Sequence, residues 1–244
     1  LLDEGVVGRV LQRHEVVPRG QMAGLEFLFI QALDHSDYGI PNLQDQIEEA
    51  PDWFVQVVAF VFKRKDGKED PEHLRVADSE QGRHLAERAF ALLEALSAIP
   101  GKNDNGTLEP DRIIQWINAV RAGCTELGRG DVGDHRIGQL LAKAPIGEDG
   151  VWPCEPVRDA IERTVNREMS NGISVGLFNS RGAYCRGCGG EQERELSARY
   201  AGWARSLEFT HPKVARILHD MARRYGHDAV WWDNEAKTRD RLIE

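Results

Sequence analysis

Two cysteines separated by two residues, Cys185 and Cys188, stand in the stretch RGAYCRGCGG and raise the question of a metal or redox site. A structural zinc site needs four ligands in tetrahedral geometry, so this pair supplies half of one. A redox C-x-x-C belongs at a strand-to-helix junction of a βαβ fold, which this sequence does not predict. The other ligand candidates are scattered singly: Cys124, Cys154, His211 and His219. We therefore expect a glycine-bordered loop and no cofactor, with Cys185 and Cys188 kept as the sole metal candidates.

The segment GISVG, with Ser174 at its centre, matches the G-x-S-x-G pattern around the nucleophile of α/β-hydrolases. Asp220 and His227 follow in the order of a hydrolase triad. That nucleophile elbow requires a buried strand before the serine and a helix directly after it. Here a polar helical segment, AIERTVNREMSN, precedes the serine and the loop LFNSRG follows it. We therefore predict no catalytic residue, and a small hydrolase or metal-dependent enzyme centred on residues 172–190 is an alternative.

The loop from Gly101 to Arg112 places asparagines, a glycine and a glutamate at positions used by EF-hand calcium loops. Its first and twelfth positions are Gly101 and Arg112, so the two carboxylates that matter most for calcium are missing. The sequence also contains no H-E-x-x-H, phosphate-loop or dinucleotide-binding motif. We expect a polar turn followed by a helix that begins at Pro110.

The 244 residues are 41% hydrophobic and 29% charged, which is typical of a folded globular chain. No window approaches the ~20 apolar residues needed to span a bilayer, and the first residues lack both Met and a basic region. Four cysteines in so long a chain fit reduced thiols. We therefore expect a cytoplasmic protein without a membrane segment, cut from a longer polypeptide.

The net charge of −9 opposes nonspecific attraction to nucleic acid and to anionic membranes. The charge is uneven, since residues 181–244 contain 12 Lys and Arg against 10 Asp and Glu. The acidic remainder of the chain would favour a basic or neutral partner. A nucleic-acid-binding module is a further alternative, because Lys213, Arg216 and Arg223 lie near one side of a helix, although interleaved acids weaken their field.

Apolar residues recur at helical spacing through most of the chain. At residues 171–190 the pattern changes to a glycine-rich stretch, for which we expect a loop or a short hairpin. Three closing helices are expected after it, with apolar stripes that begin at Leu196, Val214 and Ala229. The sequence therefore predicts an all-α fold, either an irregular bundle or a HEAT-like α-solenoid, without an exact repeat period.

We divide the chain into an acidic, helical-repeat-like region at residues 1–170, the glycine-rich segment at 171–190 and a C-terminal three-helix region at 191–244. The change in charge supports this division, because the last quarter of the chain is slightly basic and the rest is acidic. The C-terminal region is expected to pack on the first as one unit.

Trp231 and Trp232 are adjacent and therefore point about 100° apart on a helix. One ring should pack with the stripe of Ala229. The other, if exposed beside Arg223 and Arg224, would form a contact hot spot for a partner. The alternative is that both rings are buried under the preceding helix, which the rarity of large exposed aromatics favours. We take Trp231, Trp232, Arg223 and Arg224 as the candidate interaction residues.

Two blocks carry a resemblance: LEFLFIQALDHSDYGIPNLQDQIEEAPDWFVQVVAFVFKR at residues 25–64, and GEQERELSARYAGWARSLEFTHPKVARIL at residues 190–218. They resemble the C-terminal helical region of large, mostly uncharacterised bacterial multidomain proteins, some of them associated with antiphage defence. In such proteins an N-terminal NTPase or effector module carries the activity, and the helical region senses or scaffolds. The resemblance implies a noncatalytic interaction domain whose partner is another protein or another domain of the same polypeptide.

Overall fold

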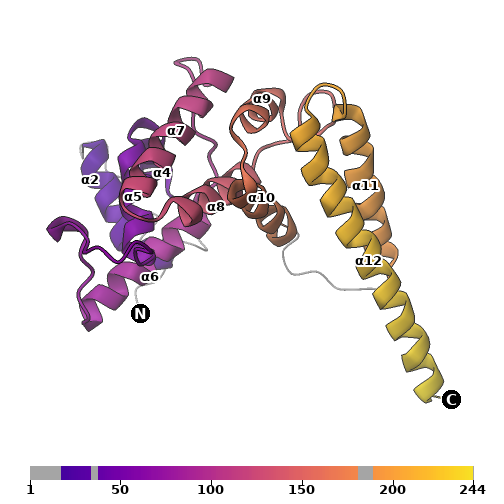
Figure 1. The fold of residues 1–244 in the computed structure, drawn as a ribbon. Coiled ribbons are helices and arrows are strands. Elements are labelled where there is room, and N and C mark those ends of the chain that lie inside the picture. Colours follow the sequence, from indigo (N-terminus) through magenta and orange to yellow (C-terminus); the bar gives the residue numbers. More distant parts are fainter. Residues whose placement is uncertain (1–17, 34–37, 181–188, 244) are drawn as a thin grey trace.

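The computed structural model describes residues 18–33, 38–180 and 189–243, and within them the chain is all-α, as predicted (Figure 1). No strand occurs in these ranges, where the one β-type pairing is an isolated bridge between Lys102 and Leu108. The α-helices are α2 (Arg19–Leu28), α3 (Ile30–Leu33), α4 (Pro41–Glu49), α5 (Pro51–Val61), α6 (Glu80–Ala95), α7 (Pro110–Glu126), α8 (Gly130–Leu141), α9 (Glu155–Thr164), α10 (Arg167–Asn179), α11 (Glu191–Leu207) and α12 (Pro212–Ile243), and a 3-10 helix, η1 (Glu72–Leu74), precedes α6.

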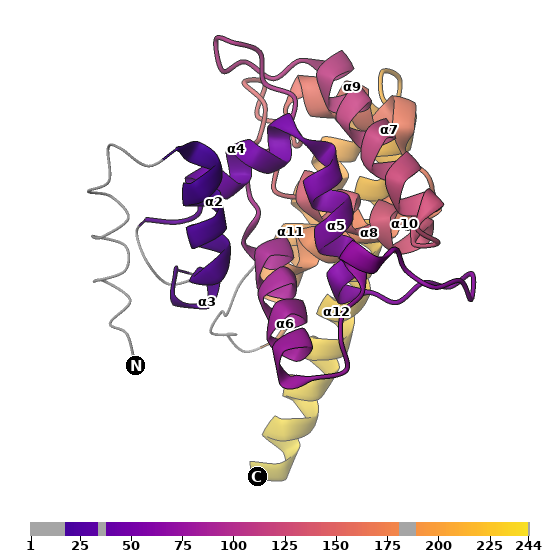
Figure 2. The same cartoon turned by 90° about the vertical axis from the view of Figure 1, so that its left-hand side faces the viewer.

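One continuous hydrophobic core joins the helices and runs from Met22 to Tyr225. Helices α2 to α8 cluster at the N-terminal end, α9 and α10 follow, and α11 and α12 form a hairpin on the far side (Figures 1 and 2). Helix α5 packs on α4, α6, α7 and α8. The apolar segment FVQVVAFVF, residues 54–62, therefore forms most of the core helix α5 and the residue directly after it. None of the described helices is at once long and apolar enough to cross a bilayer.

Helix α4 begins with proline, and the side chain at its N-cap makes no hydrogen bond. A carboxylate from another helix caps its first turn instead. The buried carboxylate of Glu26 in α2 accepts hydrogen bonds from the backbone N–H groups of Asn42 (3.2 Å) and Leu43 (2.7 Å). Tyr38 also donates to Glu26 (3.0 Å), and burial together with this carboxylate raises the pKa of Tyr38 to about 12. A negative charge at a helix N-terminus is favourable, so this contact fixes α4 on α2.

Helix α12 also begins with proline, and its first turn is likewise capped by a carboxylate from another helix. Glu162 of α9 accepts hydrogen bonds from the backbone N–H groups of Lys213 (2.8 Å) and Val214 (3.3 Å). His211, just before the helix, lies 2.9 Å from Asp159 of α9. Helix α9 therefore holds the start of α12 in place.

The predicted glycine-rich loop or hairpin is wrong for residues 171–179, which lie inside α10. Their glycines serve a helix crossing in which the backbones of α8 and α10 touch. A Cβ atom on Gly172 would lie 2.0 Å from the carbonyl oxygen of His135. A Cβ atom on Gly138 would lie 2.2 Å from the carbonyl oxygen of Met169. The crossing therefore requires glycine on both helices.

The three closing helices that we predicted are two in the structure. Helix α12 is a single helix of 32 residues that covers the predicted second and third. Tyr225 and Ala229 are both buried across the predicted break, so packing outweighs the cost of about 1 kcal/mol for Gly226 inside the helix. The rest of the predicted glycine-rich segment, residues 181–188, lies outside the described residues, and the division of the chain into three regions stays a prediction.

Adding one methyl group at the α8–α10 crossing should destabilise the fold. The Gly138→Ala variant must push the two helices apart, and overpacking of this kind costs about 1–3 kcal/mol. Gly202→Ala in α11 is the matched control, because a Cβ atom there meets nothing within 4 Å and alanine favours a helix by about 1 kcal/mol. Urea unfolding followed by circular dichroism measures both variants. Equal stability of the two would contradict the close crossing.

Candidate functional site

An open cleft of about 1000 Å³ lies between the loop at residues 62–79 and the first turns of α6. It forms because α5 ends at Val61, and the chain continues in an extended conformation at Phe62 before it returns through η1. Ser79 then caps α6 by accepting a hydrogen bond from the backbone N–H of Gly82 (3.2 Å). One wall of the cleft is therefore a loop and the other is a helix.

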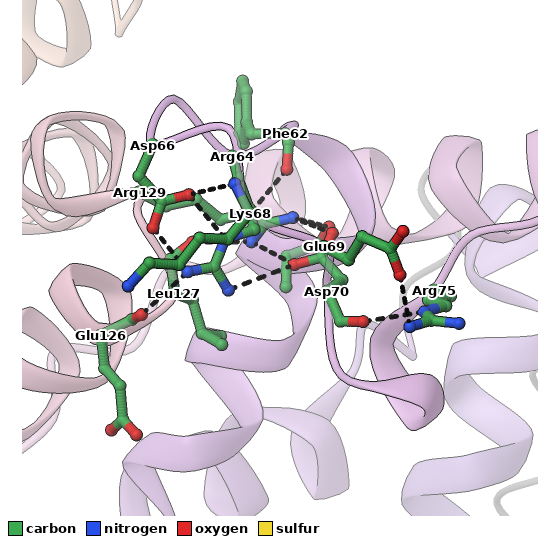
Figure 3. A network of polar contacts seen from close by, with 11 residues as sticks. Phe62, Arg64, Asp66, Lys68, Glu69, Asp70, Arg75, Glu126, Leu127 and Arg129 are labelled. Carbon is green, nitrogen blue, oxygen red and sulfur yellow. Dashed lines mark hydrogen bonds and ion pairs between the residues drawn. The ribbon is translucent and has the colours of Figure 1, made fainter.

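The loop wall is held in place by the buried guanidinium of Arg129, at the N-cap of α8 (Figure 3). Its N–H groups donate to three backbone carbonyl oxygens, those of Phe62 (2.6 Å), Leu127 (2.9 Å) and Ala59 (3.3 Å). They also bind both carboxylate oxygens of Asp70, each at 2.7 Å. All five N–H donors of the guanidinium are therefore engaged inside the protein. Arg129 shapes the cleft and has no donor left for a ligand.

Further ion pairs stiffen the same loop (Figure 3). Arg64 makes two hydrogen bonds to the carboxylate of Asp66, at 2.8 and 2.6 Å. Arg75 donates to the backbone oxygen of Asp70 (2.8 Å) and to the carboxylate of Glu69 (2.8 Å). These contacts lie within the loop, so the protein's own side chains hold this wall of the cleft in place.

The loop before α9 is fixed in the same manner. Arg158 is buried and binds both carboxylate oxygens of Asp149 at 2.7 Å, and these hydrogen bonds lower the pKa of Asp149 to about 2. Its guanidinium also donates to the backbone oxygens of Val151 and Pro153, both at 2.5 Å. A buried arginine that binds an aspartate and several carbonyl oxygens therefore orders each of these two loops.

Burial along α12 stops at Ala229, and none of residues 230–238 is buried. Figures 1 and 2 show this part of the helix extending past α11 toward the C-terminus. Trp231 is 58% exposed and Val230 is 60% exposed, whereas Trp232 is half-buried. The alternative that both tryptophans are buried is therefore wrong, and Trp231 is the ring that faces outward.

Trp231 lies on the same face of α12 as Arg224, which precedes it by two helical turns. The guanidinium of Arg224 lies over the ring of Phe178 in α10, 4.1 Å from the ring centre. Phe178 is itself 37% exposed. Arg224 and Phe178 are thus in contact at the surface, and the exposed side chains of Val230 and Trp231 follow about two helical turns further along α12. We call Phe178, Arg224, Val230 and Trp231 the C-terminal patch.

Two of the three cations that we predicted could attract nucleic acid to α12, Lys213 and Arg223, are engaged within the protein, whereas Arg216 is exposed and forms no ion pair among the described residues. Arg223, which we also predicted to contact a partner, forms an ion pair with Asp220 on its own helix. The ammonium group of Lys213 donates to the backbone oxygen of Glu162 (2.6 Å). Helix α12 therefore presents less free positive charge than its sequence indicates.

Ser174, the nucleophile of the hydrolase alternative, lies in the middle of α10 and donates its hydroxyl hydrogen to the backbone oxygen of Ser170 (3.0 Å). Within the described residues it forms no hydrogen bond with Asp220 or His227. A nucleophile elbow needs a strand before the serine, and here a helix continues on both sides of it. The G-x-S-x-G match therefore reflects the glycines of the helix crossing.

Cys185 and Cys188 lie outside the described residues. Among the residues that the structure does describe, no group of three or more His, Cys, Asp or Glu side chains is placed to hold a metal ion. Cys124 is a core residue, and its burial raises the pKa of its thiol to about 12.

In the loop that resembles an EF-hand, the Asn103 side chain accepts two backbone hydrogen bonds (both 3.0 Å) and closes a polar turn, as predicted.

No protein-family model, curated protein or solved structure matches this chain. The resemblance to helical regions of bacterial multidomain proteins therefore stays a prediction. The function has to be argued from the cleft and the C-terminal patch themselves.

The cleft was not predicted from the sequence. The segment KRKDGKEDPE, which forms part of its loop wall, reads in the sequence only as a charged loop, and such loops are usually solvated. The residue that orders it, Arg129, lies 59 positions after Asp70, and no local pattern joins the two. An isolated arginine before a glycine-started helix is the one available signal, and it is weak.

Replacing Asp70 by Asn should destabilise the protein at neutral pH and do so less in acid. Hydrogen bonds from Arg129 hold the pKa of Asp70 below its ordinary value. The stabilisation by this carboxylate is therefore present above about pH 4 and is lost as the pH falls through the lowered pKa. We expect Asp70→Asn to cost about 1.5–3 kcal/mol at pH 7 and progressively less below about pH 4.

Urea unfolding of the wild type and the variant at several pH values measures this difference. Asp131→Asn is the control, because the Asp131–Lys65 pair is 69% exposed at both ends and contributes about 0–1 kcal/mol. A loss that is the same for both variants, or that does not change with pH, would contradict the role given to Asp70.

Proposed function

We propose that this chain is a noncatalytic helical interaction domain and that the C-terminal patch is its partner-binding surface. The observation that carries the proposal is the end of burial at Ala229, followed directly by two exposed apolar residues, Val230 and Trp231. Large apolar side chains that stand together at a surface are a common mark of a protein contact.

The helix end itself also favours a partner. A short helix without tertiary packing is marginally stable in water, and helices in proteins owe most of their stability to packing of one face. The part of α12 beyond Ala229 has no buried residue through position 238. A partner that covers Val230 and Trp231 would supply the missing packing.

The composition of the patch indicates the chemistry of the partner. Tryptophan and arginine dominate the binding energy of many interfaces, and Trp231 and Arg224 lie on one helix face here. Arg224 is already positioned over Phe178, and its N–H groups have no hydrogen-bond acceptor within the described residues. The fitting partner is a protein surface with an apolar pocket for Trp231, flanked by a carboxylate for Arg224.

The role we propose is that of a sensor or scaffold within a larger bacterial protein, with antiphage defence as the setting that the resemblance of residues 25–64 and 190–218 supports. The hydrolase alternative draws little support, because Ser174 lies in the middle of α10 and donates its hydroxyl hydrogen to the backbone oxygen of Ser170. The nucleic-acid alternative draws little support either, because Lys213 and Arg223 are engaged in contacts within the protein.

Truncating Trp231 should abolish most of the partner affinity. The intact protein is used as bait, a captured protein is identified by mass spectrometry and purified, and its Kd is then measured by titration. We expect Trp231→Ala to raise the Kd by roughly 30-fold or more, the effect of losing a hot spot worth about 2 kcal/mol. Arg224→Gln should raise it less, because the aromatic part of the contact remains.

Phe209→Ala is the matched control, since Phe209 is 97% exposed in the turn before α12 and lies outside the patch. Circular dichroism confirms that each variant keeps its helices. A wild-type protein that retains no partner, or a Kd that responds equally to Trp231→Ala and Phe209→Ala, counts against the patch as the binding surface.

A further inference from the structure

We propose that the cleft between the loop at residues 62–79 and α6 binds an organic phosphate through Lys63, Lys68 and Arg83. All three residues line the cleft. The cleft belongs to the N-terminal cluster of helices and shares no residue with the C-terminal patch, so this proposal stands independently of the proposed function.

The acidic side chains of the cleft are mostly neutralised from within the protein. The Asp70 carboxylate is bound by Arg129 at 2.7 Å, and the Glu69 carboxylate is bound by Arg75 at 2.8 Å. Each of these arginines supplies the positive charge that would otherwise have to come from a ligand. The charged loop therefore directs little uncompensated negative charge into the cleft.

The cations that remain outnumber the anions that remain. Lys63, Lys68 and Arg83 are exposed, and within the described residues none of them forms an ion pair. On the acidic side Asp78 has no ion pair in the part of the chain that the structure describes, and the carboxylate of Glu80 lies 3.7 Å from the ring of His84 in α6. The cleft therefore has an excess of free positive charge in a protein whose net charge is −9.

Two properties of the lining favour an organic phosphate. A phosphate monoester carries close to two negative charges at neutral pH and presents three acceptor oxygens, which suits several Lys and Arg donors. The lining also includes Val61, Val76 and Ala77, which offer apolar contact to the organic part of a ligand. The volume of about 1000 Å³ is large enough for a ligand of nucleotide size.

The cations are carried by backbone that is already fixed. On the loop side Arg129 binds the carbonyl oxygen of Phe62, directly before Lys63 (2.6 Å). On the helix side a Cβ atom on Gly82, directly before Arg83, would lie 1.9 Å from the carbonyl oxygen of Ala77, so the helix touches the loop there. Because this backbone is already ordered, little of the binding free energy is lost in ordering it when a ligand binds.

Isothermal titration calorimetry of the intact protein with ADP, inorganic phosphate and adenosine tests the site. We expect saturable binding of ADP, weaker binding of inorganic phosphate and none of adenosine. Lys63→Gln and Arg83→Gln should each raise the Kd for ADP about tenfold, the loss of one charge-assisted hydrogen bond. Lys65→Gln is the matched control, because Lys65 lies on the same loop, is not part of the lining and pairs with Asp131 (3.2 Å).

All three substituted residues are exposed, and the unfolding midpoint checks that each variant keeps its stability. Three results would overturn the proposal. They are the absence of saturable ADP binding to the wild type, adenosine binding as tightly as ADP, and a Lys65→Gln effect as large as that of Arg83→Gln. The second would mean that the phosphate is not recognised, and the third that only the overall charge of the loop matters.

Discussion

The contact between the backbones of α8 and α10 is the constraint on which the arrangement of the chain depends. Because glycine leaves no side chain between the helices at Gly138 and Gly172, α10 lies directly on α8 and carries its C-terminal end to α12. There the ring of Phe178 stacks on Tyr225, with 6.3 Å between ring centres, and lies under Arg224. The crossing that joins the two ends of the core therefore also builds one side of the C-terminal patch.

Charged groups in the core and at its edge orient helices that otherwise pack through apolar side chains. Hydrophobic burial is non-directional, whereas a carboxylate or guanidinium has to meet its partners in a fixed geometry. Glu26 and Glu162 use this geometry to fix the starts of α4 and α12. Arg129 and Arg158 use it to fix the loops before α6 and α9. The backbone around the cleft is therefore ordered by contacts within the protein.

Periodicity predicted the helices because each buries one apolar stripe, and Pro110 marked the start of α7 correctly. It was wrong at residues 171–179, since glycines spaced for a helix crossing look the same in sequence as glycines in a loop. The candidate site was predicted in part. Trp231 and Arg224 were identified from residue type and helical phase, but the exposure of Trp231 depends on where α11 begins, because Gly190 directly before α11 lies against Ala229. The cleft depends on the pairing of Arg129 with Asp70, which no local pattern encodes.

Whether the end of α12 is left open for a partner is tested most directly by hydrogen exchange along α12 in the purified protein, read by mass spectrometry. Amides of residues 214–229 should exchange slowly, because that part of the helix is packed into the core. Amides after Asp233 should exchange far faster, as in a short helix without tertiary support. Equal protection of the two parts would mean that the chain itself covers the helix end, and would contradict the C-terminal patch as a surface kept for a partner.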